Sequence, residues 1–216
     1  MDSDYTKIMQ DLQADKGYQK EVHRIVEKEF NKIKNQYLQE FLNHPITQEI
    51  KGGIDATNTS GTLAGITNLY SFIGFDEGSD PIKPIEDLLE KSNYRIVFNN
   101  KALDSSVIFD IPTAVQIFEI TPMPWAVGRS WARGIETGIS GLGYYLKKIK
   151  NSRSGFGIQS STYQVRPGTV FKNTKYISDL INKFSKDLKS LNKITAWNQH
   201  LLIMLLIVFF FGSIIS

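Results

Sequence analysis

The sequence predicts an α+β fold: a central antiparallel β-sheet with a long N-terminal helix and a C-terminal helix packed on one face. Apolar residues recur with helical spacing over residues 18–42 and 176–191, and runs typical of β-strands lie between them. Helices kept apart from a group of strands in this way are typical of α+β domains. We expect one domain over residues 18–193, after an N-terminal arm at 1–17 and before an apolar tail at 194–216.

The first predicted helix spans residues 18–42. Its apolar side chains, among them Val22 and Phe30, recur every three or four residues and form one stripe, with charged and amide side chains opposite. We expect the helix to end before Pro45, with His44 as its C-terminal cap.

Loops rich in glycine then alternate with short apolar runs. Residues 51–65 (KGGIDATNTSGTLAG) predict an extended loop. Residues 68–75 (NLYSFIGF) fit either a strand or a buried turn, and residues 85–91 predict a short helix. A second extended loop, rich in serine and glycine, is expected at 151–168.

Three further runs carry the predicted sheet. Residues 94–98, 106–111 and 114–120 are rich in β-branched and aromatic residues, which predicts a three-stranded meander or a long hairpin. A helix is expected over residues 125–136, and Asn173 is placed to cap the last helix.

Charge is distributed unevenly, although the chain as a whole carries +3. Residues 145–193 hold eleven Lys or Arg and two Asp, a balance of +9, whereas fourteen basic and twenty acidic residues before them give −6. The absence of cysteine excludes disulfides, thiol nucleophiles and cysteine-bound metals. The basic segment therefore predicts an anionic partner, either nucleic acid or a membrane surface.

No set of residues suggests catalysis. The three histidines, His23, His44 and His200, lack metal-binding spacing. Residues 138–143 (GISGLG) lack the Lys-Ser/Thr ending of a phosphate-binding loop, so we interpret them as a turn. We expect the protein to be no enzyme and to need neither a cofactor nor a metal.

The end of the chain is apolar and uncharged. Residues 201–211 (LLIMLLIVFFF) form an unbroken apolar run of 11 residues, or 15 if Gly212 and Ser213 are included. A membrane-spanning helix needs about 20 such residues, so a tail anchor and a short buried helix or strand both remain open.

Several short motifs occur in a notable order after the long helix. Residues 58–63 read NTSGTL, residues 124–126 read PWA, and residues 131–138 read WARGIETG. Phe171-Lys-Asn then leads into the last helix. This order resembles the tail-completion and head–tail connector (neck) proteins of long-tailed bacteriophages, over roughly residues 18–188.

The resemblance implies a non-enzymatic virion structural protein. Such a protein is one subunit of a homo-oligomeric ring at the head–tail junction or the tail end, where it acts as a neck, tail-completion or tail-terminator protein. Its expected partners are neighbouring copies, other neck, tail-tube or sheath proteins, and DNA in the channel. Rings close through heterologous interfaces, and we expect the loops at 51–65 and 151–168 to become ordered only against neighbours.

Two groups of candidate contact residues follow from this resemblance. The candidate subunit-interface residues are loop residues, large apolar side chains and one acid: Asn58, Ser60, Gly61, Leu63, Leu69, Phe72, Phe75, Trp125, Trp131 and Glu136. The candidate contacts to DNA or an acidic partner are basic: Lys147, Lys148, Lys150, Arg153 and Arg166. For the large apolar residues, a place in the subunit's own core is the alternative interpretation.

Two other functions stay open. The first is a tail-anchored membrane protein with a cytosolic α+β domain, which would bind the membrane through residues 201–215. The second is a nucleic-acid-binding module that uses the basic loop.

Overall fold

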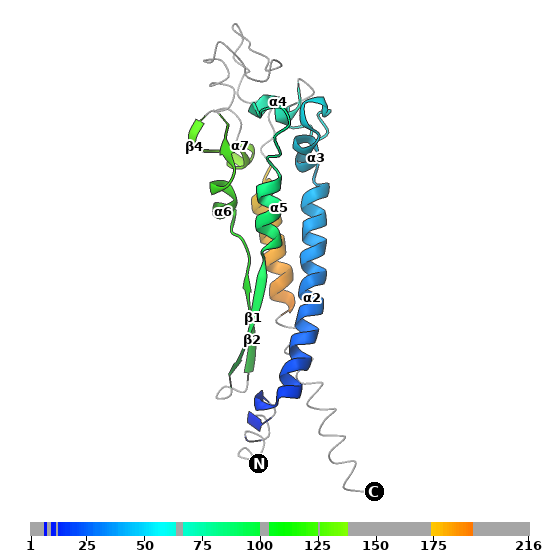
Figure 1. Ribbon diagram of the computed structural model, residues 1–216, viewed down its shortest axis with the longest axis vertical. Helices are drawn as coiled ribbons and strands as arrows, with labels where there is room; N and C mark the ends of the chain where they lie inside the picture. The colour runs from blue at the N-terminus through cyan, green and yellow to red at the C-terminus, as the bar shows by residue number, and fades with distance from the viewer. Residues whose placement is uncertain are drawn as a thin grey trace. The chain divides into compact units, whose positions relative to one another are not determined.

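The computed structural model has the predicted mixed α+β fold and is mostly helical (Figure 1). It combines a long helix near the N-terminus, a helix near the C-terminus and short antiparallel strands. The structure describes residues 7, 10–11, 13–63, 67–99, 104–124, 126–137 and 174–191. These residues form two compact units, one drawn from residues 1–35, 92–111 and 184–216, and the other from 36–91 and 112–183.

The long helix α2 (Lys16–Asn43) confirms the prediction for residues 18–42. At 1.5 Å per residue it is about 42 Å long. The carboxylate of Asp15 accepts a hydrogen bond from the Tyr18 backbone N–H at 2.7 Å, which satisfies one of the donors at the start of the helix.

A second helix, α3 (Pro45–Lys51), follows almost directly. The prediction that His44 caps the C-terminus of the first helix is wrong. Its Nδ1 accepts a hydrogen bond from the Ile46 backbone N–H at 3.2 Å, so His44 is the N-cap of α3. Pro45 stands in the first turn of α3, where its missing N–H leaves no helical hydrogen bond unmade.

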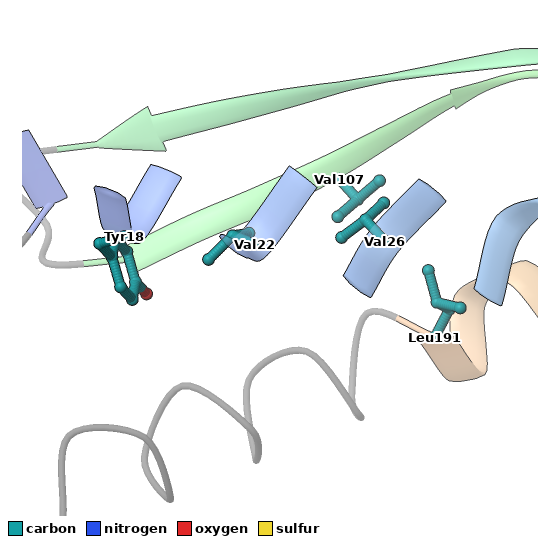
Figure 2. Packing of buried hydrophobic residues seen from close by; sticks show 5 residues of the cluster. All are labelled: Tyr18, Val22, Val26, Val107 and Leu191. Atoms are coloured by element: carbon teal, nitrogen blue, oxygen red, sulfur yellow. The ribbon is translucent and has the colours of Figure 1, made fainter. Parts of the chain in front are cut away.

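In the first unit, a hairpin packs against the N-terminal part of α2. Strands β1 (Asn93–Asn99) and β2 (Asp104–Asp110) pair antiparallel, with Ile96 opposite Val107. Phe30 of α2 stacks on Phe109 of β2 at 6.1 Å between ring centroids. Figure 2 shows the buried core of this unit, which α2, β2 and the helix at 176–191 supply: Tyr18, Val22, Val26, Val107 and Leu191.

The third predicted strand, at 114–120, is instead the helix α6 (Ala114–Glu119). Thr113 and Gln116 form a capping box: Thr113 Oγ1 accepts from the Gln116 N–H at 3.3 Å, and Gln116 Oε1 accepts from the Thr113 N–H at 2.8 Å. These reciprocal bonds start a helix despite the β-branched residues that follow. The described strands therefore form two separate hairpins rather than one meander.

The second hairpin joins β3 (Pro122–Met123) to β4 (Ala126–Ser130). It leads into α7 (Trp131–Thr137), so the helix predicted over 125–136 is confirmed only in its second half. The segment at 68–75 was expected to be a strand or buried turn, but it contains the helix α4 (Leu69–Ile73).

The second unit also contains the short 3₁₀ helix η1 (Gly53–Asp55) and the helix α5 (Lys83–Glu90). The 3₁₀ helix precedes α4, and α5 confirms the short helix predicted at 85–91. The helix over residues 176–191 confirms the last predicted helix, while its expected cap, Asn173, lies outside the described residues. Lys183 on this helix binds Glu40 of α2 at 2.6 Å.

Candidate functional site

The loop between α3 and α4 is held from inside by a buried glutamate. Glu49 of α3 is only 1% exposed. Its Oε2 accepts a hydrogen bond from the Ser60 N–H at 2.9 Å, and its Oε1 accepts one from the Leu69 N–H at 2.7 Å. One side chain thus fixes both the middle of the loop and the first residue of α4.

Asn68 holds the same loop from its other end. Its Nδ2 donates to the carbonyl oxygens of Ile54 at 2.8 Å and Ala56 at 3.0 Å, and its Oδ1 accepts from the Ser71 N–H at 2.8 Å as the N-cap of α4. We expected the loop at 51–65 to become ordered only against neighbouring subunits. Glu49 and Asn68 hold its described part within the chain, and its ordering by neighbouring subunits stays a prediction.

The candidate interface residues of this loop differ in exposure. Ser60 is partly buried and its hydroxyl lies 2.7 Å from that of Thr62, whereas Gly61 is exposed with a φ of 65°. Leu63 is buried. Neither polar side-chain atom of Asn58 has a hydrogen-bond partner among the described residues, although both are buried.

The aromatic candidates meet in one cluster. Phe75 contacts Tyr70 at 5.3 Å and Trp131 at 5.7 Å between ring centroids, the latter edge-to-face. Leu69, Phe75 and Trp131 are buried and Phe72 is partly buried. Burial fits the alternative interpretation that these are core residues, and their role between subunits stays a prediction. Trp125 lies outside the described residues.

Glu136, the one acidic candidate, joins α7 to the start of the last helix. Its Oε1 accepts from the Ser178 backbone N–H at 2.6 Å, and its Oε2 accepts from the Ser178 hydroxyl at 2.5 Å. Because the first N–H groups of a helix have no partner within it, Glu136 acts as a cap supplied by a distant part of the chain.

Tyr176 on the last helix makes a buried polar contact that no local sequence pattern predicts. Its hydroxyl lies 2.5 Å from the hydroxyl of Thr47, and its ring lies 4.7 Å from that of His44. Burial raises the pKa of the Tyr176 hydroxyl, and burial lowers the pKa of the His44 imidazole. Both groups are therefore kept neutral, as a structural contact requires.

An acidic loop at residues 76–80 follows the aromatic cluster. The Tyr70 hydroxyl donates to the carbonyl oxygen of Asp76, and the carbonyl oxygen of Ser79 lies 3.1 Å from the same hydroxyl. The Ser79 N–H donates to the Asp76 carbonyl at 3.1 Å. The backbone is thereby fixed, while the side chains of Asp76 and Glu77 are exposed.

On the same unit, a cleft of about 890 Å³ lies between α6, the β3–β4 hairpin and α7. Val115, Phe118 and Met123 give it apolar walls. Arg129 and Arg133 add two positive charges to the lining, and Glu119 adds one negative charge. Val115 at its rim is 63% exposed. None of these residues was predicted as a site residue, although two arginines four positions apart, soon after Pro124-Trp125, were a visible signal.

Both hairpins carry apolar side chains that face solvent. Val97 and Ile108 are exposed on the outer face of the β1–β2 hairpin, and Val127 is fully exposed on β4. Within the described part of the chain, β1 pairs only with β2 and β3 only with β4. Small sheets with open edges and exposed apolar side chains are typical of surfaces that pair with another chain.

The candidate basic contacts, at 147, 148, 150, 153 and 166, lie outside the described residues, as does the apolar tail at 201–215. Among the residues that the structure does describe, no three His, Asp or Glu side chains gather as a metal site. None of the described helices is both long and apolar enough to cross a membrane.

Comparison with known proteins returned no counterpart. No protein-family model, no curated protein and no solved structure matches the chain.

Proposed function

We propose that this chain is a non-enzymatic subunit of a ring in a virion, at the head–tail junction or the tail end. The observation that carries the proposal is the combination of two small open-edged hairpins with exposed apolar side chains at Val97, Ile108 and Val127. Exposed sheet edges favour pairing with another chain, and exposed apolar side chains favour burial against one. Both features are expected of a protein whose open strand edges and exposed apolar side chains become covered by neighbouring subunits.

The segments that carry the resemblance to phage connector proteins also support the proposal. Leu69 and Phe75 come from the segment after the NTSGTL motif, and Trp131 and Glu136 come from the WARGIETG motif. Phe75 packs on Trp131, and Glu136 binds Ser178 near the start of the last helix. The described residues of these segments thus belong to one compact unit, as expected of parts of a single structural subunit.

The test is the state of the full chain after expression and purification without detergent. We expect negative-stain electron microscopy and sedimentation velocity to show closed rings with a constant number of subunits. Antibodies raised against the chain should label one position on assembled virions, at the neck or the tail end. A chain that stays monomeric at micromolar concentration, and that labels no such position, would contradict the proposal.

The same preparation separates the proposal from the membrane alternative. A tail-anchored protein would sediment with membranes, and deletion of residues 201–216 would release it. A ring subunit would assemble in the aqueous phase with or without lipid. A chain that sediments only with membranes therefore supports the alternative and counts against the ring.

A further inference from the structure

We infer that the cleft between α6, the β3–β4 hairpin and α7 binds the acidic loop at residues 76–80 of a second copy of this chain. This inference rests on the proposed ring and names the contact between its neighbouring subunits. The loop and the cleft both belong to the second unit, and both consist of described residues.

The loop is suited to act as the inserted element because it is already rigid. Besides the contacts from Tyr70, Oδ1 of Asp80 accepts from the backbone N–H groups of Ile82 and Lys83, both at 3.1 Å. Gly78 takes a left-handed φ of 79°, which lets the chain turn tightly. A loop that is ordered before binding loses little conformational entropy when it binds.

The charges of the two surfaces are complementary. Asp76 and Glu77 are exposed on the loop, and Arg129 and Arg133 are exposed in the cleft. The exposed Glu119 also lines the cleft, so its charged side chains leave a net charge of +1 opposite the acidic loop. Arginine forms paired hydrogen bonds with carboxylates, so an Arg133–Glu77 contact would fix the orientation as well as add attraction. The apolar walls at Val115 and Phe118 would shield this contact from water.

The loop and the cleft are two separate surfaces of one chain. Phe75, directly before the loop, packs on Trp131, which lies on the buried face of α7. Arg133 lies on the exposed face of the same helix, and no residue of the loop lines the cleft of its own chain among the described residues. One chain therefore carries two different surfaces, which is what a heterologous ring interface needs.

The test reverses one charge on each surface. Glu77→Arg and Arg133→Glu, each in the full chain, should weaken association at least about tenfold in 50 mM salt, because each brings like charges together. In 1 M salt the difference from the unchanged chain should shrink to about threefold or less, because the Debye length falls to about 3 Å. Sedimentation velocity measures association, and circular dichroism confirms that each variant is folded.

Mixing the two variants gives the sharper result. In the mixture, the changed loop of one variant faces the changed cleft of the other, and the unchanged loop faces the unchanged cleft. Each variant alone should associate at least about tenfold more weakly than the unchanged chain. The mixture should recover association in species that contain both chains, which native mass spectrometry identifies. Glu27→Arg and Lys20→Glu, both exposed on α2, serve as controls with the same changes in net charge.

The outcomes separate this inference from the proposed function. Rings that form normally from each single variant would overturn the inference and leave the ring itself in place. Single variants that fail to assemble, with no recovery on mixing, would likewise overturn the pairing of loop and cleft. An unchanged chain that never associates would overturn both.

Discussion

Glu49 offers a direct test of how the loop before α4 is held. Its two carboxylate oxygens accept hydrogen bonds from two different backbone N–H groups, those of Ser60 and Leu69, and the side chain is 1% exposed. Glu49→Gln keeps the size and shape of the side chain. It leaves one acceptor oxygen, however, and turns an amide N–H₂ group toward the second backbone donor.

The expected loss in the free energy of unfolding follows from the number of hydrogen bonds that each substitution removes. A hydrogen bond to a charged group contributes about 1.5–3 kcal/mol, so the loss of one bond in Glu49→Gln should lower the free energy of unfolding by about 2 kcal/mol. Glu49→Ala removes both bonds and leaves a small cavity, so we expect a loss of about 4 kcal/mol.

Urea unfolding measures these losses, and amide hydrogen exchange at Ser60 and Leu69 localises them. Both amides should exchange faster in Glu49→Gln. The matched control is Glu27→Gln, an exposed glutamate on α2, which should stay within about 0.5 kcal/mol of the unchanged chain. The reasoning fails if Glu49→Gln unfolds like this control and the Leu69 amide keeps its protection.

The helix caps formed by His44, Glu136 and Thr113 can each be tested by substitution. Burial lowers the pKa of His44 from its ordinary 6.5, and its Nδ1 must be unprotonated to cap α3, so stability should fall as the pH drops below about 6.5. His44→Asn keeps a capping oxygen without titrating, so urea unfolding at pH 7.5 and pH 5 should show a smaller difference for it. Glu136→Ala should destabilise the start of the last helix by about 1–3 kcal/mol, seen as faster amide exchange at Ser178 than in Glu119→Ala. Thr113→Ala should cost about 1 kcal/mol in urea unfolding, and Thr113→Ser much less, because serine keeps the capping hydroxyl.

The long helix and the first hairpin could be predicted because their patterns are strong. The apolar stripe along α2 repeats over many turns, and along the paired strands partly or fully buried positions alternate with exposed ones over 94–98 and 106–110. The run at 114–120 was wrongly predicted as a strand because Val115, Ile117 and Phe118 favour strands. The Thr113–Gln116 capping box, which was visible in the sequence, decided the outcome instead.

Similar end signals could have identified α4. Asn68 is a favoured N-cap residue, and Gly74 after the helix takes a left-handed φ of 83°. The contact of Glu49 with Ser60 and Leu69 was beyond prediction, however. A single glutamate in a short amphipathic helix looks exposed, and only the folded chain shows that its partners lie 11 and 20 residues away. Likewise, nothing local showed that Tyr70 would fix the loop at 76–80.

Burial changes how the predicted interface residues should be understood. Trp131 and Phe75 are buried and pack on each other inside the second unit, and a role for them between subunits stays a prediction. In the proposed ring their effect on assembly would be indirect: Phe75 precedes the exposed Asp76, and Trp131 stands two residues before the exposed Arg133. The one aromatic contact thus fixes the two charged surfaces relative to each other. In a head-to-tail ring that relation sets the rotation from one subunit to the next, so a core contact would govern ring closure while exposed charges supply the attraction.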